Sequence, residues 1–101
     1  MVVFEHSLNI LEGGLSSTVS ISTISAQSAT FTFPAAQAGY VLVTTDANCF
    51  VRQGTNPTAL SDGTDQILLA NQTYRCWVNS GNKLAFKTAS GTGTVYLTPG
   101  G

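Results

Sequence analysis

The clearest strand signal in the sequence is Lys83-Leu84-Ala85-Phe86-Lys87, in which the large apolar residues alternate with polar or small ones. Successive side chains of a β-strand point to opposite faces of its sheet. The pattern therefore places Leu84 and Phe86 on one face and both lysines on the other. It predicts a strand with one buried face.

A second stretch, Thr94-Val95-Tyr96-Leu97-Thr98, repeats this alternation just after the turn residues Gly91-Thr92-Gly93. Two alternating runs separated by a short glycine-containing turn are typical of a β-hairpin. The sequence therefore predicts that the two strands pair, with their apolar residues in one core patch. The pattern favours a C-terminal half built as a meander.

Period-two alternation and breaker residues extend this interpretation over most of the chain. The expected strands cover residues 18–22, 30–33, 40–45, 48–53, 66–70, 73–78, 83–88 and 94–98. Short strands at this spacing, with turn signals between them, indicate a sandwich or barrel. We expect an all-β fold: a single antiparallel β-sandwich or small barrel, of jelly-roll or immunoglobulin-like type, over residues 15–101.

Residues 1–14 differ from the rest of the chain and predict a short N-terminal arm. Three of their apolar residues recur at i, i+4 and i+7, which allows a short amphipathic helix before Gly13-Gly14. An arm that orders on a partner, or an edge strand of the same domain, fits equally well. Exposed apolar side chains are costly, so we expect a contact role for Phe4, Leu8, Ile10 and Leu11.

Composition limits the classes of partner. Of 101 residues only 9% are charged, and the net charge is −1. This charge provides no basic surface for nucleic acid. The N-terminus lacks the basic start and apolar run of a secretory signal, and no apolar run is long enough to span a membrane. We expect synthesis in a cytoplasm without a signal peptide, and neither nucleic acid nor membrane as a partner.

Residues that often carry catalysis do not form a recognisable motif. His6 is the single histidine and lies in the arm, with no nucleophile motif beside it. Asp62 and Asp65 stand in a turn-rich loop, where capping of the turn is the simplest role. A zinc or calcium site would need more ligands than this spacing offers. We therefore expect no enzymatic activity, no metal and no cofactor.

Two cysteines, Cys49 and Cys76, both stand inside expected strands. If those strands are neighbours, a disulfide between them could stabilise the fold by about 3–4 kcal/mol. In a reducing compartment, two half-buried thiols are the alternative. The sequence leaves both interpretations open.

The stretch Thr73-Tyr74-Arg75-Cys76-Trp77-Val78 carries the strongest surface signal. Its alternation places Tyr74, Cys76 and Val78 on the core side, and Arg75 and Trp77 outside. Trp and Arg are enriched at the energetic centres of protein interfaces, so these two residues are interface candidates. The alternatives are a Trp77 covered by a loop of the same chain, or one that stacks against a sugar ring.

Three stretches, residues 49–55 (CFVRQGT), 65–70 (DQILLA) and 87–98 (KTASGTGTVYLT), resemble small all-β proteins encoded among the virion genes of tailed bacteriophages. The resemblance covers residues 40–99. That group often has an aromatic residue where this chain has Gln53, and a Pro-Ala-Gly turn where it has residues 69–71. The resemblance implies a non-enzymatic virion component, such as a head decoration (cement) protein or a neck or tail accessory protein.

Low charge and abundant hydroxyl groups agree with assembly, because uncharged faces lose little on desolvation. We expect localisation in the virion, with copies of the same chain and the major capsid or another virion protein as partners. A cyclic homo-oligomer is expected, with a trimer favoured. The competing function is a small carbohydrate-binding or adhesin-like sandwich that uses Trp77, Tyr74 or Tyr96.

Overall fold

The computed structural model describes residues 17–33 and 37–100, and this part of the chain folds into eight β-strands without a helix. The strands are β1 (Ser17–Ile21), β2 (Ala26–Gln27), β3 (Gly39–Thr45), β4 (Cys49–Gly54), β5 (Gln66–Leu68), β6 (Thr73–Val78), β7 (Lys83–Lys87) and β8 (Gly93–Gly100). The all-β prediction is confirmed. Within the same residues, no helix is long and apolar enough to cross a membrane.

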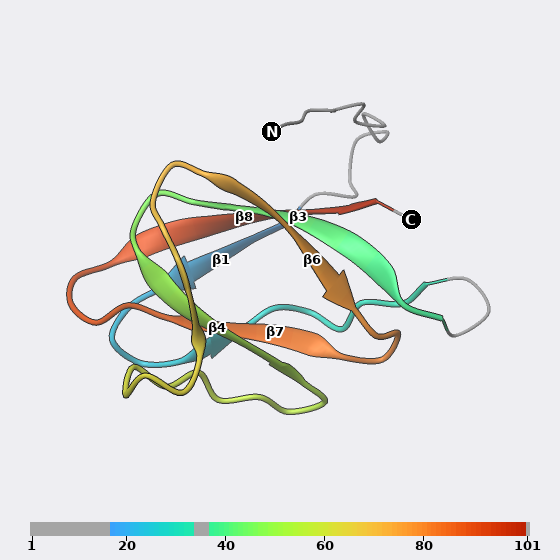
Figure 1. Ribbon diagram of the computed structural model, residues 1–101, viewed down its shortest axis with the longest axis horizontal. Coiled ribbons are helices and arrows are strands. Elements are labelled where there is room, and N and C mark those ends of the chain that lie inside the picture. Colours follow the sequence, from blue (N-terminus) through green and yellow to red (C-terminus); the bar gives the residue numbers. More distant parts are fainter. Residues whose placement is uncertain (1–16, 34–36, 101) are drawn as a thin grey trace.

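The strands of the described residues form two four-stranded antiparallel sheets, β1-β8-β3-β6 (the first sheet) and β2-β7-β4-β5 (the second sheet). Strand β1 pairs with β8, β2 with β7, β3 with β6, and β4 with β5. The chain is thus one long hairpin, folded at β4 and β5 and rolled into two layers. This is the arrangement of a jelly roll. Figure 1 shows the first sheet above β4 and β7 of the second.

The predicted hairpin between residues 83–88 and 94–98 is wrong, and so is the meander. Strand β7 pairs with β2 and β4 in the second sheet, whereas β8 pairs with β1 and β3 in the first. The Gly91–Gly93 connection therefore crosses from one sheet to the other. Alternation identifies the buried side of a strand but not its hydrogen-bonded neighbour.

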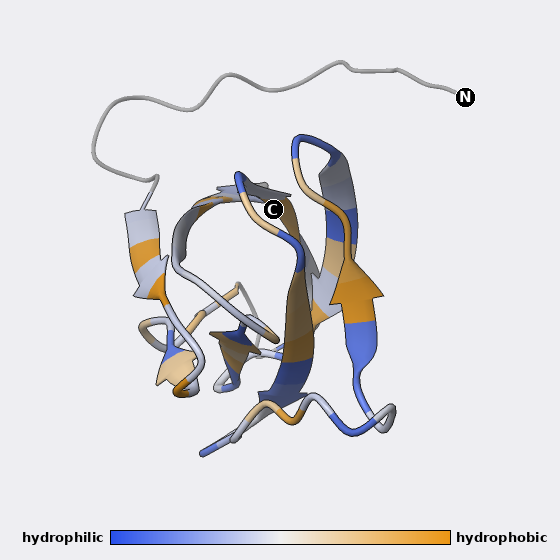
Figure 2. Ribbon diagram, turned by 90° about the vertical axis from the view of Figure 1, so that its left-hand side faces the viewer, coloured by the Kyte–Doolittle hydropathy of each residue, from blue (hydrophilic) through white to orange (hydrophobic). Residues whose placement is uncertain are grey.

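The core lies between the two sheets, and the apolar patch expected from the last two strands belongs to it. The patch residues Leu84, Phe86, Val95 and Leu97 are all buried in one apolar cluster. Leu84 and Phe86 belong to the second sheet, whereas Val95 and Leu97 belong to the first, so the patch forms across the two layers and not along one sheet. Figure 2 shows the alternation on β1, where apolar bands lie between polar ones.

Residues 30–33 were expected to form a strand, and this prediction is wrong. Their side chains still alternate, since Phe31 and Phe33 are buried and Thr32 is exposed. Their backbone bonds to the β6–β7 turn: the Phe31 N–H donates to Asn82 O (2.9 Å) and the Gly81 N–H to Phe31 O (2.8 Å). A turn offers too few consecutive backbone groups to extend a ladder.

The long β4–β5 connection covers part of the second sheet's outer side. Gln27 Nε2 on β2 donates to Pro57 O (2.8 Å), and the Ala59 N–H donates to Ser25 Oγ (2.9 Å). Ala59 and Ala85 are both buried on this side. Figure 1 shows the connection below β4, in yellow-green. The two sheets therefore differ in how much of their outer sides is covered.

Candidate interaction surface

The outward side of the first sheet carries side chains that are all partly or fully exposed. We call it the outer face, and it consists of Thr18, Ser20, Tyr40, Leu42, Thr44, Thr73, Arg75, Trp77, Thr94, Tyr96 and Thr98. The register aligns these residues in rows across the strands, as in Thr18, Tyr96, Thr44 and Thr73. Threonine suits such positions because its branched side chain packs well on a pleated surface.

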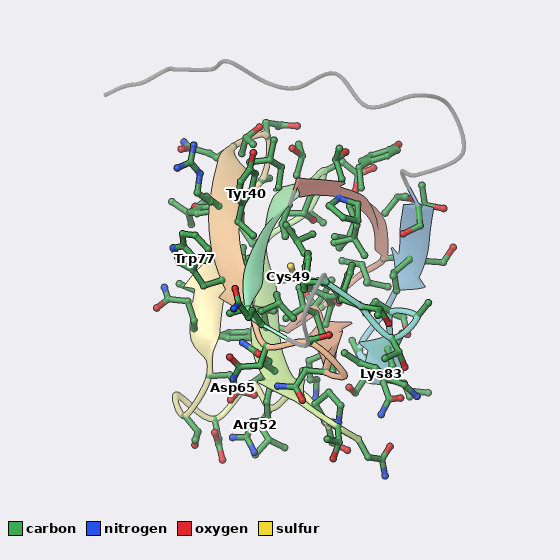
Figure 3. All side chains as sticks on the ribbon, turned by 90° about the vertical axis from the view of Figure 1, so that its right-hand side faces the viewer. Tyr40, Cys49, Arg52, Asp65, Trp77 and Lys83 are labelled. Carbon is green, nitrogen blue, oxygen red and sulfur yellow. The ribbon has the colours of Figure 1, made fainter. Side chains whose placement is uncertain are left out.

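Trp77, Tyr40 and Arg75 form a cluster at one edge of the outer face, which we call the Trp77 cluster. Tyr40 on β3 pairs directly with Trp77 on β6, and their ring centroids lie 6.0 Å apart at 81°. The guanidinium carbon of Arg75 lies 4.9 Å from the centroid of the Tyr40 ring. The Trp77 side chain remains 63% exposed. Figure 3 shows Trp77 on the outside of β6, near Tyr40.

The outer face is almost free of charge. Arg75 is its one charged residue, and within the described residues the guanidinium contacts the Tyr40 ring without forming an ion pair. Its cation–π contact orients the side chain along the face. The face thus offers one positive group beside two aromatic rings, in a surface of hydroxyls.

Gln53 supports the position of Trp77 from the other sheet. Gln53 follows Cys49 and Val51 at two-residue spacing on β4, and both of these pack in the core, so the Gln53 side chain lies on the side of β4 that faces the first sheet. Gln53 Nε2 donates to Trp77 O (3.0 Å), and Gln53 Oε1 accepts from the Asn79 N–H (2.8 Å) and from Asn82 Nδ2 (2.8 Å). One amide therefore joins β4 to the end of β6 and to the turn that follows.

Sequence reasoning placed Arg75 and Trp77 outside and Tyr74 inside, and the exposures agree with this. Tyr74 packs against the core, and its hydroxyl accepts from the Leu69 N–H (3.0 Å). It does not belong to the outer face, whereas Tyr96 does and is 50% exposed. Tyr40 and Gln53 were missed. Alternation of Tyr40 with buried Val41 signals its outward direction, but no local signal links Gln53 to Trp77.

Cys49 and Cys76 lie on β4 and β6, which belong to different sheets and are not neighbours. Both thiols are free; Cys49 is buried and Cys76 is half-buried. Figure 3 shows Cys49 between the layers. Burial raises the pKa of both thiols, and the Thr45 side chain only partly offsets this for Cys49. A raised pKa disfavours the reactive thiolate.

The two loop aspartates have separate structural roles. Asp62 Oδ1 accepts from the Thr64 N–H (3.0 Å), and hydrogen bonds from Thr64 lower the pKa of Asp62. Asp65 accepts from Arg52 Nε (2.7 Å) and from the Leu60 N–H (2.6 Å). In residues 17–33 and 37–100, no three His, Cys, Asp or Glu side chains gather to hold a metal.

The arm candidates Phe4, Leu8, Ile10 and Leu11, and His6 with them, lie outside the described residues. No protein-family model, curated protein or solved structure matches the chain. The features of the structure that bear on function are therefore the jelly roll and the outer face with its Trp77 cluster.

Proposed function

We propose that this protein is a non-enzymatic structural component of a tailed-bacteriophage virion, which decorates the head and stabilises it. The observation that carries the proposal is the Trp77 cluster on an open, nearly uncharged sheet. Trp, Tyr and Arg are the residue types that most often dominate binding energy at protein interfaces. Here all three adjoin each other at the surface.

The surroundings of the cluster suit burial against another protein. Apart from Leu42, the rest of the outer face carries hydroxyl groups, and two of them, Thr44 Oγ1 and Thr73 Oγ1, bond to each other (2.9 Å). Neutral groups of this kind lose far less than ions when water is removed. A charge-poor centre with aromatic residues and arginine is typical of protein interfaces.

The fold and the sequence resemblance support the same function. Jelly rolls occur in viral capsid domains and also in lectins, so the fold alone does not decide between these uses. The three stretches that resemble phage virion proteins lie on β4, on β5, and from the end of β7 through β8. They build the sandwich, while the Trp77 cluster lies mainly on β6.

A carbohydrate-binding function is the competing proposal, and the ring geometry speaks against it. Sugar chains bind well to aromatic rings that present coplanar faces. Here the planes of Tyr40 and Trp77 are at 81°, and Arg75 lies over the Tyr40 ring. A partner protein, whose side chains approach from several directions, fits this arrangement better.

Purified virions of the phage that carries this gene provide the test. We expect quantitative mass spectrometry to find the protein in a fixed ratio to the major capsid protein, and antibody labelling to locate it on the head. Heads that lack it should lose DNA at a lower temperature, and added wild-type protein should restore them. Trp77→Ala protein should not, whereas the matched Ile67→Ala variant, which removes an exposed apolar side chain from the second sheet, should.

The same experiment separates the competing proposals. Labelling at the neck or tail would assign the protein to an accessory role there and contradict head decoration. Absence from the virion would contradict the proposal altogether. Binding to glycan arrays that Trp77→Ala abolishes, combined with absence from the virion, would favour the carbohydrate-binding alternative.

A further inference from the structure

The single cation of the outer face, Arg75, stands among apolar side chains. Its direct neighbour on β3 is Leu42, and its guanidinium carbon lies 4.9 Å from the centroid of the Tyr40 ring. Trp77 follows two residues later on the same strand and the same face. Arg75 and Trp77 are exposed, whereas Tyr40 and Leu42 are half-buried. The cation therefore lies on an apolar surface that is open to water.

The guanidinium of Arg75 keeps its hydrogen-bond donors available. Within the described residues, the ring of Tyr40 is its contact, and its N–H groups form neither a hydrogen bond nor an ion pair. The five N–H groups of an arginine lie in one plane, and stacking on an aromatic ring leaves them accessible. Stacking also restricts the side chain, so less conformational entropy is lost when the donors bind. Arg75 is thus ready to bind an acceptor from another molecule.

Covering the outer face determines which acceptor Arg75 requires. Removing a cation from water is costly unless an opposite charge replaces the lost hydration. A carboxylate meets this need, because it accepts two parallel N–H···O bonds from one guanidinium. Nucleic acids and anionic membranes present many negative charges together, for which a single arginine is too few. One carboxylate on a protein surface matches one cation among neutral groups.

The described part of the chain does not offer this carboxylate to a second copy. The outer face itself carries none. Asp46 accepts from a backbone N–H of β8 (2.8 Å), Asp65 bonds to Arg52, and Asp62 accepts from a backbone N–H of its own loop. Two outer faces packed together would enclose two guanidiniums without a counter-ion. A different protein therefore fits this face better than another copy.

We propose that Arg75 and Trp77 together bind a partner protein that presents one carboxylate and one apolar side chain about 7 Å apart, the spacing of alternate residues on a strand. The carboxylate pairs with the guanidinium, and the apolar side chain packs against the exposed indole. This inference rests on the proposed function, because it states the chemistry of the virion surface that the outer face covers. It names the class of partner residue on which head binding depends.

Selection from a displayed library of random peptides on the immobilised full-length protein tests the inference without virions. We expect the enriched peptides to carry Asp or Glu two positions from a large apolar residue. Replacing that acid by its amide should weaken binding of a synthetic enriched peptide at least about tenfold. The single tryptophan reports the binding, because its emission should shift to shorter wavelength as the peptide covers it.

Variants at Arg75 show whether the acid meets the guanidinium. Arg75→Met keeps a long side chain without the charge, so it should bind the acidic and the amide peptide equally. Arg75→Lys keeps the charge but lacks the planar fork, so it should retain the preference for the acid with weaker binding. Lys87→Met removes a cation from the second sheet and should change neither constant. Circular dichroism of each variant confirms folding.

Four outcomes overturn the inference: no enriched peptide, enrichment without acidic residues, an Arg75→Met variant that still prefers the acid, or binding of acidic glycans in place of acidic peptides. Self-association of the full chain that Arg75→Met abolishes would also overturn it, because the carboxylate would then belong to another copy. These results do not depend on whether the protein is present in virions. Conversely, absence from virions contradicts the proposed function and leaves the peptide constants as they are, so the two failures are distinguishable.

Discussion

Gln53 Nε2 on β4 donates a hydrogen bond of 3.0 Å to the carbonyl oxygen of Trp77 on β6. Among the described residues, β6 is an edge strand of the first sheet, and a side chain of the second sheet bonds to its backbone at that edge. The contact holds the end of the strand that carries Trp77 and Arg75. Several measurable consequences depend on this contact and on the rest of the sandwich.

Replacing Gln53 should weaken the contact between β4 and the end of β6, which belong to different sheets. Gln53→Ala removes three hydrogen bonds. Each is partly exposed, so we expect the free energy of unfolding to fall by about 1–2 kcal/mol in urea titration. Gln66→Ala is the matched control, because within the described residues the Gln66 side chain bonds only to the neighbouring Ile67 O (3.1 Å). Equal stability of the two variants would contradict the role given to Gln53.

Removing the Asp65 carboxylate should loosen the connection over the second sheet. Asp65→Ala breaks the contact with Arg52 and the bond from the Leu60 N–H. Because Arg52 is partly exposed, we discount the ion pair and expect a loss of about 1–3 kcal/mol in unfolding free energy. Cleavage by protease within residues 55–65 should also become faster. Asp62→Ala, in the same loop, should leave the unfolding free energy almost unchanged, because Asp62 is fully exposed.

Truncating a core ring should have the largest effect on stability. Phe86 is fully buried between the sheets, so Phe86→Ala is expected to destabilise the fold by about 3–5 kcal/mol in thermal or urea unfolding. The half-exposed Tyr96 serves as control, and Tyr96→Ala should cost less than about 1 kcal/mol. A loss below about 1 kcal/mol for Phe86→Ala would mean that the two faces of β7 are assigned in reverse.

Trp77 is the single tryptophan of the chain, which makes its environment directly measurable. Its exposure predicts fluorescence emission of a solvated indole, which should shift to shorter wavelength when a partner protein covers the outer face. Trp77→Ala should change unfolding free energy by less than about 1 kcal/mol while weakening association. Emission typical of a buried indole in dilute monomer would contradict the open Trp77 cluster.

Thiol labelling tests the state of Cys49 and Cys76. With burial raising the pKa of both thiols, little thiolate forms in the folded protein near pH 8. We expect slow reaction with a disulfide reagent in buffer, slowest at buried Cys49, and rapid labelling of both in urea without reductant. Two labels per unfolded chain confirm free thiols, and none would indicate a disulfide.

The raised pKa of both thiols also predicts how stability depends on pH. Because the folded state holds the thiol protons more tightly than the unfolded state, the free energy of unfolding should decline as the pH rises through the pKa values of the thiols.

The side of each strand that faces the core could be predicted from the sequence, and so could part of the candidate surface. The alternation of residues 73–78 places Arg75 and Trp77 outside, and both are exposed. The reason is local: the side-chain period of a strand is two, and large apolar residues occupy the side that loses contact with water. The same logic identifies Leu84 and Phe86 as core.

The neighbours of those residues could not be predicted in the same way. Tyr40 and Gln53 reach Trp77 from β3 and β4, far away along the chain. Pairing of Tyr40 with Trp77 depends on the register of two strands, and Gln53 meets β6 only because the two sheets pack face to face. Neither condition leaves a pattern in the sequence around Trp77.

By itself, the sequence determined that this chain is all-β, where most strands lie, and which side of each strand is apolar. Only the tertiary structure decided which strands are neighbours. Residues 83–87 and 93–100 have the alternation and the turn of a hairpin, yet they pair in different sheets. Backbone hydrogen bonds are nearly equivalent from one strand to the next, so pairing is selected by burial over the whole molecule. With β7 and β8 in opposite layers, Phe86 and Leu97 are both fully buried, and the two sheets close around one core.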